Sequence, residues 1–294
     1  MEKALVSVII TTYRRPALLC RAIESVLRQS YQGIEIIVVD DASEDTTEER
    51  VREIEDERIK YICHAKNMGL AAVGRNTGLK EAKGEFVAFL DDDDEWREDK
   101  LERQLRLMGR YDAVFSSALV NRKYEKRYGY ADVSVSALRR GNQFCPSSLL
   151  ARTAIMREVG FDENLRQGED WDAYIRMIRK HRLGYVNETL LYLNDGAHQR
   201  ITNEAKDLSK AELEKRMAVV YKNRDFFGKY YSRRHIASVI LSYIGSRSGV
   251  AAQLVYAVRR CGVVPVVDVL AWKIARRTRR IVERIFSSDL VKSS

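Results

Sequence analysis

The stretch EFVAFLDDDD, residues 85–94, joins an uninterrupted apolar run to four consecutive aspartates. An apolar run of this length is typical of a strand that is buried on both faces of a sheet. Four adjacent carboxylates repel one another unless a cation or water relieves them. Asp91 and Asp93 can place oxygens on one side of a turn, and oxygen ligands are those that Mg²⁺ and Mn²⁺ prefer. A solvated acidic loop or an acidic helix N-terminus explains the run alone equally well, but its place after a buried strand favours a metal.

Two further apolar strands precede this stretch, at Val6–Thr12 and at residues 34–39, and helical patterns separate the three. Strand–helix alternation predicts a mostly parallel sheet that is covered by helices. Ligands of such sheets collect at the carboxyl ends of the strands. Three of these ends carry polar residues: Thr11 with Tyr13, Asp40 with Asp41, and the Asp91–Asp94 run. The sequence therefore predicts a ligand site at one edge of the sheet.

The second half of the chain has a less regular pattern. It predicts strands at residues 146–151 and 185–193, and helices at Thr153–Val159, residues 171–180 and residues 206–227. The formal net charge of +9 is unevenly placed, since residues 216–294 hold 16 Lys and Arg against 4 Asp and Glu. The remainder holds 35 basic and 38 acidic residues. We therefore expect an α/β domain over residues 1–215 and a basic helical extension over residues 216–294.

Several classes of site and location are disfavoured. No glycine-rich dinucleotide fingerprint or P-loop follows a strand, so a bound nucleotide has to be held by other groups. Tyr13 can stack on a base and Asp40 can accept a base N–H, although a packing tyrosine and a turn aspartate are the simpler readings of each alone. The four cysteines lie far apart and match no zinc spacing. Without a signal-peptide pattern or a long apolar segment, we expect a cytoplasmic protein.

Several motifs, in order along roughly the first 200 residues, resemble those of family 2 glycosyltransferases with the GT-A fold. They are VSVIITTY at residues 6–13, IIVVDDAS at 36–43, N-x-G-x₅-R-N-x-G at 67–78, FLDDDDEW at 89–96, GFDE at 160–163 and GEDWD at 168–172. The resemblance implies an α/β, Rossmann-like, mostly parallel sheet flanked by helices, followed by a C-terminal helical extension. Residues 1–110 would form the nucleotide-sugar half and residues 111–215 the acceptor half. The chain beyond residue 215 has no such match.

The resemblance also implies roles for individual residues. Donor-binding positions are Thr11, Tyr13, Asp40, Arg75, Asp91 and Asp92. Metal-binding positions, for Mn²⁺ or Mg²⁺, are Asp91 and Asp93, with His198 as a further candidate. The catalytic base is Asp170, with Glu169 and Trp171 on the acceptor side. The residues alone leave simpler readings open, since Asp170 could cap a helix, Trp171 could pack in the core and His198 could lie in solvent.

The expected function is therefore that of an inverting transferase that moves a sugar from a nucleotide-diphosphate donor, expected to be UDP-linked, to a glycan or lipid-linked acceptor of the cell envelope. Two alternatives stay open. A sugar nucleotidyltransferase should carry a glycine-rich basic loop after its first strand, and TTYRR at residues 11–15 is not one. A non-catalytic membrane-surface binding protein could retain the fold, but the intact D-x-D and E-D positions argue against lost activity.

The basic extension predicts membrane association. Between Pro265 and Phe286, apolar residues recur at near-helical spacing and arginines occupy much of the remainder. Such a helix can lie in a membrane interface and bind anionic headgroups, which predicts a peripheral protein on the inner face of the cell membrane. The alternative is a basic helix packed on the catalytic domain. Nucleic acid is not an expected partner, because the acidic first part offers no supporting basic face.

Overall fold

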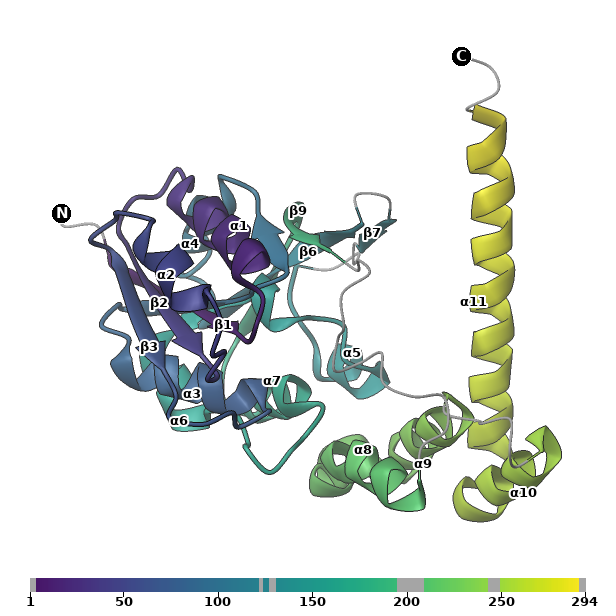
Figure 1. Ribbon diagram of the computed structural model, residues 1–294. Coiled ribbons are helices and arrows are strands. Elements are labelled where there is room, and N and C mark those ends of the chain that lie inside the picture. The colour runs from purple at the N-terminus through teal and green to yellow at the C-terminus, as the bar shows by residue number, and fades with distance from the viewer. Residues whose placement is uncertain (1–3, 122–123, 127–130, 195–208, 243–248, 291–294) are drawn as a thin grey trace. The chain divides into compact units, whose positions relative to one another are not determined.

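The computed structural model describes residues 4–121, 124–126, 131–194, 209–242 and 249–290. The chain forms two compact units, residues 1–199 and residues 200–294 (Figure 1). We call them the N-terminal unit and the C-terminal unit.

The N-terminal unit is built on one sheet, which in the described residues has nine strands in the order β3-β2-β1-β4-β8-β6-β9-β5, with β7 paired to β6. The strands are β1 (Val6–Thr12), β2 (Ile34–Asp40), β3 (Ile59–Cys63), β4 (Phe86–Asp91), β5 (Asp94–Trp96), β6 (Ala113–Val120), β7 (Tyr124–Lys126), β8 (Leu150–Arg152) and β9 (Leu183–Leu193). Strands β3, β2, β1 and β4 run parallel, as do β6 and β9, while β8 is antiparallel to β4 and β6. The predicted mostly parallel sheet is confirmed.

Helices cover both faces of this sheet (Figure 1). On one face lie α1 (Pro16–Leu27), α2 (Thr47–Arg52) and α4 (Lys100–Leu105); on the other lie α3 (Ala71–Glu81), α6 (Thr153–Val159) and α7 (Glu169–Ile178), with α5 (Val135–Arg140) packed against α7. Successive strand residues point to opposite faces. Val8 and Ile10 therefore join Ile23 of α1 in one buried cluster, whereas Ile9 faces α3. Burial on both faces explains why β1 reads as an unbroken apolar run.

Helix α3 packs unusually close to β1. A Cβ atom added at Gly78 would lie 2.4 Å from Cγ2 of Ile9, and one added at Gly74 would lie 2.9 Å from Cγ2 of Thr11. These glycines let the helix backbone approach the strand to a distance that no larger residue allows. The close approach places Arg75, which lies between them, near the carboxyl ends of β1 and β4.

Three sequence-based elements differ from the structure. The strand predicted at residues 146–151 is instead a 3₁₀ turn, Pro146–Ser148, followed by β8, because proline holds φ at helical values. Helix α7 begins at Glu169 rather than at residue 171. The helix predicted over residues 206–227, of which 206–208 lie outside the described part, is two: α8 (Lys210–Lys222), which a capping box of Ser209 and Glu212 begins, and the start of α9 (Arg224–Ser242).

The C-terminal unit is helical. Helices α8, α10 (Val250–Cys261) and α11 (Val263–Leu290) each pack against α9. Gly228, at φ 68° and ψ 175°, interrupts α9, so that a second helical segment begins at Lys229. None of the helices in the described ranges combines the length and the apolar character needed to cross a bilayer. Large apolar side chains are nevertheless exposed on α11, namely Val263, Val264, Val267, Trp272 and Ile274.

Candidate active site

The ends of β1, β2 and β4 meet at one edge of the sheet. Thr12 lies opposite Asp40 in the β1–β2 ladder, and Thr11 lies opposite Asp91 in the β1–β4 ladder. The loops that follow these strands hold non-glycine residues in the left-handed region: Arg14 at φ 52°, Ala42 at 62° and Glu44 at 49°. Such conformations are costly and collect at functional sites. The predicted convergence of the strand ends is therefore confirmed, and strained loops surround it.

Arg75 links two carboxylates that lie far apart in the sequence. Its Nη2 donates to Oδ1 of Asp91 at 2.7 Å, and its Nη1 donates to Oε1 of Glu169 at 2.9 Å. The side chain is buried, and its guanidinium lies 5.5 Å from the ring centroid of Phe161. Burial opposes the charge, but Asp91 and Glu169 together hold the pKa of Arg75 above its usual value. The guanidinium thus joins the D-x-D segment to the first turn of α7.

Asp170 lies in that same first turn, after Gly168, which takes a left-handed conformation with φ 79°. Its Oδ2 accepts a hydrogen bond from Nδ2 of Asn142 at 2.7 Å, and its Oδ1 accepts one from the backbone N–H of Trp171. Asp170 is the second residue of α7 rather than its N-cap, and its hydrogen bond with Trp171 satisfies an N–H of the first helical turn. Burial, followed by the neighbouring carboxylate of Glu169, raises the pKa of Asp170 to about 7. A carboxyl with such a pKa suits a general base at neutral pH.

The four aspartates from the last residue of β4 to the first residue of β5 have different surroundings. Asp92 is buried, and its carboxylate accepts hydrogen bonds from Oγ1 of Thr12 at 2.8 Å and from Nη1 of Arg15 at 3.1 Å. Burial raises the pKa of Asp92 to about 6, although Arg15 opposes the rise. Asp94 accepts a hydrogen bond from Oγ of Ser147 at 2.7 Å. Asp92 and Asp94 therefore fix the loop to β1 and to the 3₁₀ turn.

Asp91 and Asp93 are the alternate members of the run. The Asp91 side chain is one-third exposed, with Arg75 on its Oδ1, and Asp93 lies 3.6 Å from Arg15. Within the described residues, His, Cys, Asp and Glu form no group of three that could hold a metal, and His198 lies outside those residues. Proteins commonly bind Mg²⁺ through one or two carboxylates together with substrate phosphates. Two carboxylates can suffice for a cation that arrives with a diphosphate, and metal binding by Asp91 and Asp93 stays a prediction.

The candidate nucleoside-binding residues occupy three different environments. The Tyr13 ring is 38% exposed, and the Arg14 guanidinium lies 5.1 Å from its centroid. The Asp40 carboxylate is buried and accepts hydrogen bonds from Ser43 and from the hydroxyl of Tyr61. The Thr11 side chain faces α3. Tyr13 is therefore open to a stacking ligand, whereas Asp40 holds the loop after β2, and base recognition by Asp40 stays a prediction.

The remaining candidate, Trp171, is buried and donates from Nε1 to the carbonyl oxygen of Leu138 at 3.0 Å. Three polar residues of the site did not follow from the sequence: Arg15, Asn142 and Ser147. Arg15 belongs to TTYRR, and its place directly after a buried strand is a signal that could have identified it. Asn142 and Ser147 lie in connecting segments without a motif, so their contacts with Asp170 and Asp94 depend on tertiary structure.

Comparisons with known proteins show the family and the fold of the chain. The sequence profile of Glycosyl transferase family 2 matches residues 7–158, just over half of the chain. An uncharacterized glycosyltransferase of Rickettsia conorii is 37% identical over 195 residues, which are 63% of this chain and 32% of that protein; the chain thus spans about a third of that relative. The Escherichia coli UDP-Glc:alpha-D-GlcNAc-diphosphoundecaprenol beta-1,3-glucosyltransferase WfaP is 37% identical over 185 residues, 60% of this chain and 71% of WfaP.

A solved structure with the same fold is that of the mannosyltransferase PcManGT from Pyrobaculum calidifontis, in complex with GDP-Man and Mn²⁺. It is 19% identical to this chain and aligns with a TM-score of 0.60 over 93% of this chain and 80% of PcManGT. This likeness confirms the predicted GT-A fold.

Proposed function

The chain belongs to glycosyl transferase family 2, and we propose that it is an inverting glycosyltransferase that uses a UDP-linked sugar. The acceptor is a hydroxyl of a glycan or lipid-linked sugar in cell-envelope polysaccharide synthesis. The observation that carries this proposal is the bridge from Arg75 to Asp91 and Glu169, since it holds the donor side of the site against the segment that contains Asp170. The UDP donor and the lipid-linked acceptor follow the printed activity of WfaP, which is far more similar in sequence than PcManGT.

On the donor side, the exposed ring of Tyr13 offers a face on which a base can stack. Asp91 and Asp93 would hold Mn²⁺ or Mg²⁺ together with the donor diphosphate. When bound, the cation supplies Lewis-acid stabilisation of the charge that develops on the leaving diphosphate. Asp92, held by Thr12 and Arg15, keeps the loop that carries both ligands in place.

On the acceptor side, Asp170 removes the proton of the attacking hydroxyl. The acceptor oxygen bonds to the anomeric carbon as the bond from that carbon to the diphosphate breaks, and the configuration inverts. Asn142 and the N–H of Trp171 orient the two oxygens of Asp170, and burial beside Glu169 raises its pKa toward neutrality. One base is sufficient for inversion, so this route needs no covalent intermediate.

The C-terminal unit is the membrane-facing part in this proposal. Several large apolar residues of α11 are exposed. More than half of the surface is exposed in Val263, Val264, Val267 and Ile274, and Trp272 is 46% exposed. An apolar surface on a basic helix suits the interface of an anionic membrane. The protein would then work as a peripheral protein on the inner face of the cell membrane, where a lipid-linked acceptor is presented.

The test is a panel of nucleotide sugars, assayed for binding and for slow donor hydrolysis with and without Mn²⁺. One UDP-sugar should bind in a metal-dependent way and be hydrolysed slowly. A control variant at an exposed carboxylate outside the site, Asp132→Asn, should leave both readouts unchanged. Absence of binding to every donor, with or without Mn²⁺, would remove the transferase proposal.

A further inference from the structure

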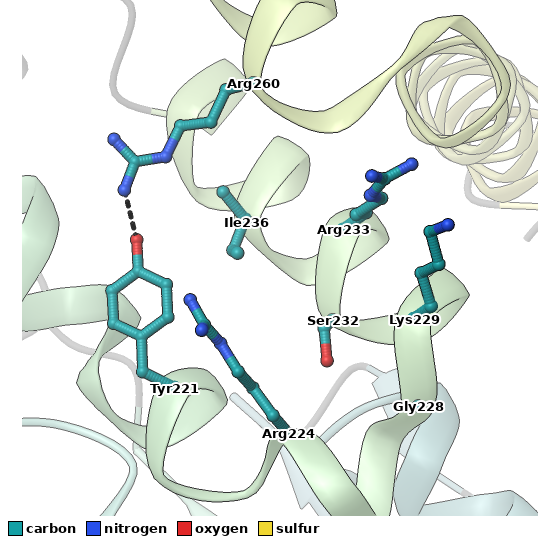
Figure 2. A pocket seen from close by; sticks show the side chains of 8 residues that line it. All are labelled: Tyr221, Arg224, Gly228, Lys229, Ser232, Arg233, Ile236 and Arg260. Atoms are coloured by element: carbon teal, nitrogen blue, oxygen red, sulfur yellow. Dashed lines mark hydrogen bonds between the residues drawn. The ribbon is translucent and has the colours of Figure 1, made fainter.

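The C-terminal unit contains a pocket of its own, with a volume of about 330 Å³ (Figure 2). Helices α8, α9 and α10 contribute to its wall. The residues on which its chemistry depends are Tyr221, Arg224, Lys229, Ser232, Arg233 and Arg260. Four of these six side chains are cationic and none is acidic.

The positive charges of this pocket are poorly balanced. Arg260 is paired, since its Nη1 lies 2.7 Å from Oε1 of Glu214 and its Nη2 donates to the hydroxyl of Tyr221 (Figure 2). Arg224, Lys229 and Arg233 are exposed, and no carboxylate of the described residues lies within ion-pair distance of them. Like charges gathered around one cavity repel one another and attract an anion.

The helix geometry adds to this attraction. Because Gly228 interrupts α9, a new helical segment begins at Lys229 and continues to Ser242, and its first turn contributes to the pocket wall. The first N–H groups of a helix have no partner within the helix, and its N-terminus carries a partial positive charge. Anions bind readily at such a terminus.

Ser232 provides a second, independent observation on this pocket. The residue is 7% exposed, and its Oγ has no hydrogen-bond partner among the described residues. In Figure 2 the hydroxyl points to the side of the pocket where Arg224 and Gly228 lie. A buried hydroxyl without a partner is costly, and an acceptor oxygen of a bound molecule would satisfy it.

We propose that this pocket binds a phosphoryl group, as a phosphate or diphosphate ester. The guanidinium groups of Arg224 and Arg233 match the geometry of phosphate oxygens, Lys229 adds a point charge, and the hydroxyl of Ser232 donates to one oxygen. The volume lies at the lower end of the range for small-molecule sites, about 300–1,000 Å³, and suits a headgroup. A lipid headgroup and a soluble phosphate compound share this chemistry. None of the lining residues belongs to the candidate donor site, so the proposal stands or falls without the transferase proposal.

Binding to the full chain is measured in two arms at low salt and without nucleotide sugar. The first arm is calorimetric titration with inorganic pyrophosphate, and the second is sedimentation with phosphatidylcholine vesicles that contain or lack phosphatidic acid. We compare Arg233→Gln and Ser232→Ala with a matched control, Arg259→Gln, which removes an exposed charge from α10 outside the pocket. Thermal melting verifies that each variant is folded.

Both pocket variants should bind at least about tenfold more weakly, because a hydrogen bond to a charged group is lost, while Arg259→Gln should change binding less than twofold. This pattern with pyrophosphate assigns a soluble phosphate compound, and the same pattern with phosphatidic acid vesicles alone assigns a lipid headgroup. The proposal is overturned by absence of binding in both arms, by an equal loss in Arg259→Gln, or by unchanged binding in Ser232→Ala.

Discussion

The Asp170→Asn variant tests the assignment of the base most directly. Asparagine has the same shape and keeps an acceptor oxygen for the N–H of Trp171, but it cannot take a proton. Loss of a general base typically lowers the rate by about 10²–10⁴-fold. We therefore expect sugar transfer to fall by this factor while the Kd for the donor changes less than about twofold. Steady-state transfer kinetics and donor titration measure the two quantities separately.

The pH profile of the wild type gives a second readout of the same residue. The ionised carboxylate is the active form, and burial beside Glu169 raises the pKa of Asp170 to about 7. Transfer should therefore rise about tenfold per pH unit below pH 7 and level off above it, and the residual rate of Asp170→Asn should lack this rise. Full transfer activity in Asp170→Asn, or a wild-type profile without the rise, would refute the assignment.

The same pKa has a consequence for stability. Because the folded pKa of Asp170 lies above its unfolded value near 4, the stabilisation it brings is complete below pH 4 and is lost as the pH rises through 7. At roughly 1.4 kcal/mol per pKa unit, the shift corresponds to at most about 4 kcal/mol of unfolding free energy, and the partial exposure of Asp170 reduces this figure. Asparagine does not titrate, so Asp170→Asn lacks this loss. Its free energy of unfolding, measured in urea, should therefore increase relative to that of the wild type as the pH rises from 5 to 8. A decrease over that interval would contradict the raised pKa of Asp170.

Three further substitutions test other parts of the site. Arg75→Lys keeps the charge but loses the guanidinium group that reaches both Asp91 and Glu169, so transfer should fall at least about tenfold in steady-state assays. The free energy of unfolding should fall by less than the roughly 3–5 kcal/mol that is typical when a buried ion pair is fully broken. Asp93→Asn should remove the Mn²⁺ dependence of donor binding in titrations with and without the metal, and an unchanged dependence would exclude it as a ligand. Gly78→Ala should lower the free energy of unfolding by about 1–3 kcal/mol, measured by urea, because the added methyl group overlaps Ile9; equal stability would contradict the close packing of α3 on β1.

Much of the sheet could be predicted from the sequence because its central strands are buried on both faces. The apolar runs of β1 and β4 leave little ambiguity, since Val8 and Ile9 each face a covering helix. The same reasoning located the strand ends, and the pairing of Thr11 with Asp91 confirms that they meet. The 3₁₀ turn at Pro146 was misread because a short apolar run does not distinguish a strand from a turn.

The contacts inside the site were less predictable, for a physical reason. Arg75 and Glu169 are separated by 94 positions, and no local pattern records that packing will bring them together. Asn142 reaches Asp170 from the segment after α5, where nothing in the local sequence distinguishes it from any other loop asparagine. The motifs therefore identified which residues belong to the candidate site, whereas the hydrogen-bond and ion-pair partners of these residues are determined by the fold.

The Arg75 bridge also makes three positions of this chain a single energetic unit. A substitution at Asp91 leaves one arm of a buried guanidinium without its acceptor, and a substitution at Glu169 does the same to the other arm. Double-mutant cycles among the three should be non-additive, because the first loss already removes part of what the second would cost. In directed evolution, a change at one of these positions should be recovered more readily by compensating changes at the other two than by changes elsewhere in the sheet. The tolerance of Asp91, Arg75 and Glu169 to substitution should therefore be assessed for the three residues together rather than for each alone.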